Sequence, residues 1–155
     1  MQTNRPDDLE VSLSEGAQVS SGGMAQGQAL SIIVGSRRMS PCDHETFARF
    51  KLWVAKSVSE ASIDIYCAGN VSIAHWDDRA GAHYPHLLNP CECGTFLPIE
   101  IEPGPMLASA IGLLSDLQRL RKLPEPVPIE FDALIGAMME MAENSIATNT
   151  ALEIR

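Results

Sequence analysis

Basic side chains are scarce in this 155-residue chain, because eleven lysines and arginines stand against twenty acidic residues and give a formal net charge of −9. Phosphate backbones and anionic membrane surfaces are bound by clustered lysine and arginine, and the sequence has no such cluster. Apolar runs are also short. The stretch from Met106 to Leu114 is interrupted by Ser109 and Gly112 and falls well below the ~20 residues of a membrane span. We therefore expect neither nucleic acid nor a membrane as the partner.

The amino-terminal region lacks the apolar core of a secretory signal, which favours a cytoplasmic protein. Residues 1–28 combine Ser, Gly and Gln with four acidic side chains, and Val11, Leu13 and Val19 are too scattered to bury a face. This composition predicts a disordered tail over residues 1–28. Residues 29–155 are then long enough for a single folded domain.

The remaining sequence predicts three helices packed on a small antiparallel sheet, which is an α+β fold. Apolar residues recur at three- and four-residue steps, as in amphipathic helices, over residues 43–59, 103–122 and 130–147. Strands are expected at residues 29–34, in a hairpin over 62–76, and at 95–102. Residues 77–90 are rich in Asp, Gly, His and Pro, which predicts a loop.

Three of the four cysteines belong to a short internal repeat. Residues 41–47 read Pro-Cys-Asp-His-Glu-Thr-Phe, and residues 90–96 read Pro-Cys-Glu-Cys-Gly-Thr-Phe. At a constant offset of 49 residues, four of the seven positions are identical, and two more keep an acid or a metal-ligand type. Zinc takes four Cys or His ligands in a tetrahedron, and two tight turns that present two ligands each would supply them.

The repeat therefore predicts one structural Zn²⁺ bound by Cys42, His44, Cys91 and Cys93. Its second half, Cys91-Glu92-Cys93-Gly94 followed by an apolar strand, resembles the knuckle of zinc-ribbon proteins, in which a glycine lets the backbone reverse after a cysteine pair. One residue separates the two cysteines here, whereas zinc-ribbon pairs usually have two. The resemblance implies a zinc-knuckle-like site at residues 91–94.

The first half of the repeat has a second interpretation as a helix start. Ser40 and Asp43 fit a capping box, which would place Cys42 and His44 in the first turn of a helix and point them to opposite sides. The zinc interpretation instead requires the helix to begin at Asp43 or His44.

Other ligands and other thiol chemistries remain open. The pair His83 and His86 lies shortly before the cysteine pair and would replace Cys42 and His44 as ligands. Cys67 lies on the apolar face of the predicted hairpin and fits a buried thiol. Cys91 and Cys93 also fit buried thiols or a redox pair.

No catalytic signature is complete. His44-Glu45 begins like the metalloprotease motif His-Glu-x-x-His, but Ala48 occupies the position of the second histidine. A shell of three cysteines and one histidine leaves no position for water, and closed shells are usually structural. The sequence favours a non-catalytic zinc-binding domain that acts through protein–protein interaction. The alternatives are a zinc-dependent hydrolase using Cys91, Cys93 and a histidine, and a thiol redox protein using Cys91 and Cys93.

The expected partner is another protein or a second copy of the chain. From residue 100 onward the chain has nine acidic and four basic side chains, so its C-terminal half is the acidic part. Met139 and Met141 flank the core stripe of the last predicted helix, and adaptable methionines suit contact with a protein groove. We expect the interface over residues 130–147.

Overall fold

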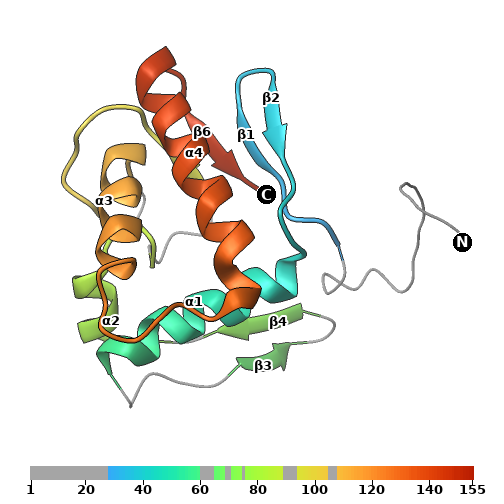
Figure 1. Cartoon of the computed structure of the whole chain (residues 1–155), viewed down its shortest axis with the longest axis vertical. Helices are drawn as coiled ribbons and strands as arrows, with labels where there is room; N and C mark the ends of the chain where they lie inside the picture. The colour runs from blue at the N-terminus through green and yellow to red at the C-terminus, as the bar shows by residue number, and fades with distance from the viewer. Residues whose placement is uncertain (1–27, 60–64, 69–70, 75, 89–93, 105–107) are drawn as a thin grey trace, which may run out of the picture.

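The computed structural model describes residues 28–59, 65–68, 71–74, 76–88, 94–104 and 108–155. Within these ranges the chain forms four α-helices, a four-stranded antiparallel sheet and a separate two-stranded hairpin (Figure 1). The α+β class predicted from the sequence is confirmed. The predicted tail over residues 1–28 lies almost entirely outside the described residues.

The larger sheet joins the first and last strands of the described chain. Its strand order is β2 (Arg37–Met39), β1 (Ile32–Val34), β6 (Leu152–Ile154) and β5 (Thr95–Phe96), and each neighbouring pair is antiparallel. Gly35 turns the chain from β1 into β2 with a φ of +61°, a conformation that glycine adopts without steric cost. Strands β2 and β6 were not predicted, and β6 lies at the centre of the sheet.

Helix α1 (His44–Val58) begins at a cap formed by Asp43. The carboxylate of Asp43 accepts the N–H of Thr46 at 2.8 Å and satisfies one of the amide groups that a helix start leaves free. Phe50 and Val54 are fully buried, as their spacing predicted. The interpretation of Ser40 as the start of a capping box is therefore wrong. The helix begins at His44, as the zinc interpretation requires.

Strands β3 (Ile65–Ala68) and β4 (Val71–Ala74) pair antiparallel and lie against α1, which confirms the predicted hairpin; the predicted turn at residues 69–70 lies outside the described residues. Helix α2 (Asp78–His83) follows it and also contacts α1 (Figure 1). The sequence predicted a loop here, which is wrong. Asp77 accepts the N–H of Ala80 at 3.0 Å and caps a helix that is too short to show an apolar period. The described chain therefore has four α-helices and not three.

Helix α3 (Ala110–Leu120) begins later than the predicted range of 103–122. Ser109 caps it, since its Oγ accepts the N–H of Gly112 at 2.9 Å. The residues on either side of Ser109 form backbone hydrogen bonds with Leu97, which hold this segment extended. The strand predicted over residues 95–102 is likewise shorter, because Pro98 has no N–H with which to continue the pairing.

Helix α4 (Asp132–Thr148) follows a short 3₁₀ turn, Ile129–Phe131, and packs against both α3 and β1 (Figure 1). It ends at Asn149, whose left-handed φ of 52° lets the N–H of Thr150 donate to the carbonyl of Ser145 at 3.1 Å. This cap reverses the chain and leads it into the sheet as β6.

Two faces of α4 are covered, by α3 and by the sheet, and this corrects one prediction. Met141 is fully buried together with Met138, whereas we expected Met141 at the surface beside Met139. Met139 is half-buried at the margin of the core. None of the helices that the structure describes combines the length and the apolar character needed to cross a membrane.

Candidate functional site

Cys42, the first predicted zinc ligand, lies just before α1. Its carbonyl accepts the N–H of Leu30 at 2.8 Å, which fixes this segment beside the chain that leads into β1. The side chain is half-buried against the core and forms no disulfide. Burial and the adjacent Asp43 carboxylate raise the pKa of the Cys42 thiol to about 11, against the opposing effect of Arg49. The thiol is therefore protonated at neutral pH unless a cation stabilises the thiolate.

His44, the second predicted ligand, is the first residue of α1. Burial and the charge of Lys51 lower the pKa of its ring. The charge of Asp43 and a hydrogen bond with the backbone of Arg155 raise it. Burial is the largest of these effects, and the net direction is downward. A hydrogen bond that raises a histidine pKa is one that the ring donates, so the Arg155 carbonyl is the acceptor. In the neutral ring the other nitrogen then keeps its lone pair.

Gly94 directly follows the predicted ligand Cys93 and lies against the end of β6. Its carbonyl accepts the N–H of Ile154 at 2.8 Å, and a Cβ at this position would lie 2.3 Å from the Ile154 carbonyl oxygen. The φ of Gly94 is +70°, and β5 begins at the next residue. Both features agree with the glycine turn and the outgoing strand of the zinc-knuckle resemblance.

The end of β6 therefore lies near both predicted ligand segments, since the Ile154 N–H donates to Gly94, and Ser31, next to the Leu30 that donates to Cys42, pairs with Arg155. Cys91 and Cys93 lie outside the described residues. Within the described ranges, no three Cys, His, Asp or Glu side chains are grouped so that they could hold a metal ion.

Where the structure describes both copies, the internal sequence repeat is not a structural repeat. Thr46 and Phe47 belong to helix α1, whereas the matching Thr95 and Phe96 form strand β5. The similarity of the two segments therefore lies in their residue types and not in a shared backbone conformation.

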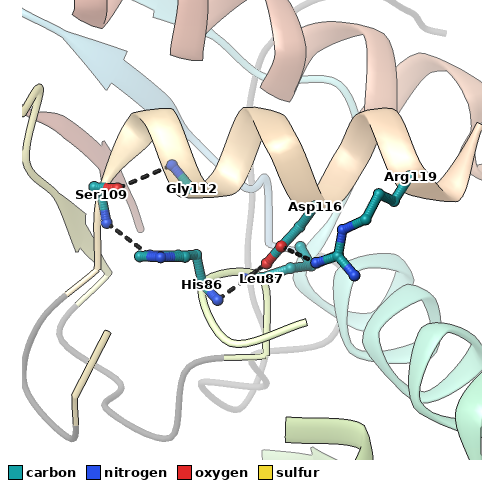
Figure 2. A network of polar contacts seen from close by, with 6 residues as sticks. All are labelled: His86, Leu87, Ser109, Gly112, Asp116 and Arg119. Atoms are coloured by element: carbon teal, nitrogen blue, oxygen red, sulfur yellow. Dashed lines mark hydrogen bonds and ion pairs between the residues drawn. The ribbon is translucent and has the colours of Figure 1, made fainter. Parts of the chain in front are cut away.

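A second polar group joins the segment after α2 to the start of α3 (Figure 2). His86 is 7% exposed, and its Nδ1 accepts the backbone N–H of Ser109 at 3.0 Å. The ring lies over Gly112, where an added Cβ would be 2.1 Å from the ring carbon Cδ2. Burial lowers the pKa of His86, and the charge of Asp116 opposes this effect. This rival ligand already uses one nitrogen lone pair inside the protein.

Asp116 holds the same segment from the second turn of α3. Its Oδ2 accepts the backbone N–H groups of His86 and Leu87, each at 3.0 Å, while Oδ1 pairs with Arg119 (Figure 2). The Arg119 guanidinium also lies 4.8 Å from the centre of the Tyr84 ring. Asp116 is only 2% exposed, so a buried carboxylate satisfies two buried amide groups.

Ser109, His86 and Asp116 are the residue types of a hydrolytic triad, but their connections differ. In a triad the imidazole takes the proton of the serine hydroxyl, and the carboxylate bonds to the other ring nitrogen. Here the Ser109 hydroxyl accepts from the backbone of Gly112, and Asp116 accepts from the backbone of His86. The arrangement ties a turn to a helix.

Sequence reasoning missed this group, although one signal was present. Asp116 occupies the same helix face as the buried Leu113, Leu117 and Leu120. A carboxylate within an apolar stripe is expected to be paired, because burial of an unpaired charge is costly. His83, the other rival ligand, is exposed at the end of α2, and its ring contacts that of Tyr84.

Comparison with known proteins adds no functional information. No protein-family model, no curated protein and no solved structure matches this chain.

Proposed function

We propose that the chain is a non-catalytic zinc-binding domain, in which Cys42, His44, Cys91 and Cys93 hold one structural Zn²⁺, and that it acts by binding another protein or a second copy of itself. Three thiolates and one imidazole complete the tetrahedral shell that structural zinc sites use. Such a shell leaves no position for an activated water, which is why the proposal is not catalytic.

The contrast between the two candidate histidines, His44 and His86, is the observation that carries the proposal. Zinc-bound histidines almost always donate their second ring N–H to a carbonyl or a carboxylate, which fixes the tautomer and orients the ring. The backbone of Arg155, which raises the pKa of the His44 ring, offers an acceptor of this kind for one ring nitrogen. A bond to this acceptor leaves the other nitrogen with a free lone pair, as metal binding requires.

His86 has the opposite arrangement. For its Nε2 to bind zinc while Nδ1 accepts the Ser109 N–H, both nitrogens would have to lack a proton, and a neutral imidazole always carries one. This comparison supports the Cys42 and His44 pair over the alternative pair of His83 and His86.

The position of Gly94 supports the second pair of ligands. Neighbouring strands lie about 4.8 Å apart, and Gly94 is paired with Ile154 while the His44 ring bonds to Arg155. Gly94, the residue after Cys93, therefore enters β5 beside the end of β6.

The raised pKa of Cys42 argues against a redox role for this thiol. A redox cysteine reacts as the thiolate and needs a lowered pKa, whereas the pKa of Cys42 is raised to about 11. Bound zinc deprotonates its cysteine ligands outright, so zinc uptake should release protons. The partly buried thiol would then change from a protonated core side chain into a ligand.

The proposed partner surface is the exposed face of α4. This surface is smaller than the sequence predicted, because Met141 is buried. Asp132 and Glu143 are exposed on this helix, and Glu140 is exposed beside Arg37, with which it forms an ion pair. Half-buried Met139 adds an adaptable apolar side chain. These charges suit a basic partner surface, with an association rate that falls as salt increases.

The zinc proposal is tested by measuring the zinc content of desalted variants. His44→Ala should lose zinc, and Cys93→Ser should do the same. The matched control is His86→Asn, because an asparagine oxygen can still accept the Ser109 N–H while the imidazole is gone. Loss of zinc from His86→Asn with retention in His44→Ala would transfer the site to the rival histidine pair. Absence of zinc from the wild type and from every variant would refute the proposal.

A further inference from the structure

We propose that His86 is a pH-sensitive latch: the neutral ring holds residues 84–88 against the start of α3, and the protonated ring releases them. The latch consists of His86, Ser109, Gly112 and Asp116. The inference does not rest on zinc binding.

The hydrogen bond to Ser109 makes the latch selective for the neutral ring. A backbone N–H is always a donor, so Nδ1 of His86 must be the acceptor in the 3.0 Å contact. Protonation would place an N–H of the ring against the N–H of Ser109. Both groups would then be buried donors without an acceptor between them, and an unsatisfied buried donor is costly.

The helix start opposes a positive ring for a second reason. Ser109 is the N-cap of α3 and Gly112 lies in its first turn, where the helix dipole is positive. The ring lies in the space that any side chain at residue 112 would occupy, with an added Cβ only 2.1 Å from it. A protonated ring in this position therefore remains close to the positive end of the helix.

Asp116 is the charge that favours protonation of His86, and its other bonds limit that effect. Its Oδ2 is engaged by the backbone N–H groups of His86 and Leu87, and its Oδ1 by Arg119. Tyr84, at the start of the segment, lies under Arg119, and His83 contacts Tyr84 from the exposed side. The net effect of burial and Asp116 still lowers the pKa of His86.

The direction of the pH effect follows from this lowered pKa. In the released state the ring has its ordinary pKa of 6.5, and in the closed state the pKa is lower. Between these two values the released state binds more protons, so acid favours release. The equilibrium constant for opening should rise by up to about tenfold for each unit by which the pH falls within that window.

The latch is tested by amide hydrogen exchange at Ser109, read by NMR across the acidic range and corrected for the intrinsic pH dependence of exchange. In the wild type, protection of the Ser109 amide should decrease by up to about tenfold for each unit by which the pH falls. The decrease should follow protonation of the His86 ring. His86→Asn keeps an acceptor and does not titrate, so its Ser109 protection should be nearly independent of pH. His83→Gln, which removes an exposed histidine outside the latch, should retain the wild-type response.

Two results would overturn the proposal. One is an acid response of Ser109 that is the same in His86→Asn and in the wild type. The other, which needs no variant to fold, is titration of the wild-type His86 ring without any change in Ser109 protection.

Discussion

Replacement of Asp116 by alanine should be among the most destabilising single changes in this chain. The carboxylate accepts two buried backbone N–H groups, from His86 and Leu87. Each N–H left without a partner costs about 2 kcal/mol, so the pair costs about 4 kcal/mol. Loss of the ion pair with Arg119 adds about 1 kcal/mol, and alanine is the better helix former by roughly 0.5 kcal/mol, which leaves a net loss of about 4.5 kcal/mol.

Asp116→Asn is the matched control, because an amide carbonyl has two lone pairs and can still accept both N–H groups. It loses the ion pair with Arg119, whose side chain is 42% exposed, and such a pair contributes only about 1 kcal/mol. Urea unfolding followed by tryptophan fluorescence, at neutral pH and a fixed zinc concentration, measures both variants. An asparagine variant as unstable as the alanine variant would show that the charge dominates. An alanine variant within about 0.5 kcal/mol of the wild type would refute the reasoning.

The remaining predictions concern a glycine turn, pH and the core. Gly94→Ala should cost about 3 kcal/mol, because a left-handed residue would direct its Cβ into a carbonyl of β6, while Gly136→Ala on the open face of α4 should stabilise by about 1 kcal/mol in the same urea assay. The pKa values of His44 and His86 are both lowered from 6.5, so the unfolded chain binds more protons below that pH. The free energy of unfolding should therefore decrease as pH falls below 6.5, and decrease further below 3.8, where the lowered pKa of Asp43 adds to the loss, as an acid series of urea curves would show. Met141→Glu should cost at least about 4 kcal/mol because it places a charge in the core, and circular dichroism would report the loss of helix.

Elements with their own periodic pattern were predictable from the sequence. The spacing of Phe50 and Val54 identified α1, the alternation in residues 62–76 identified the hairpin, and the stripe through Leu134 and Met138 identified α4. In each case the signal is local, because one face of a helix or strand must be apolar if it is to be buried.

The missed elements depend on partners far away in the sequence. Strand β6 has three residues and is held between β1 and β5, which precede it by more than fifty positions. A segment this short carries too little pattern of its own. Asn149 was the available signal, since asparagine tolerates the left-handed cap that ends α4 and starts a new element.

For the candidate site, residue types were predictable and connections were not. The sequence favoured His44 through the internal repeat and left His83 and His86 as the alternative imidazole ligands, because spacing says nothing about hydrogen bonds. Only the tertiary structure shows that the Ser109 N–H occupies a lone pair of His86, while His44 bonds to the backbone of Arg155. The choice between the two ligand pairs rests on this difference.

Zinc K-edge X-ray absorption on the purified, tag-free protein tests the central proposal most directly. The proposal predicts about one zinc per chain, with three sulfur ligands at about 2.3 Å and one nitrogen ligand at about 2.0 Å. Two sulfurs with two nitrogens would indicate the rival histidine pair. A shell that contains water oxygen, or a protein that binds zinc far below one equivalent, would contradict the assignment of a closed structural site.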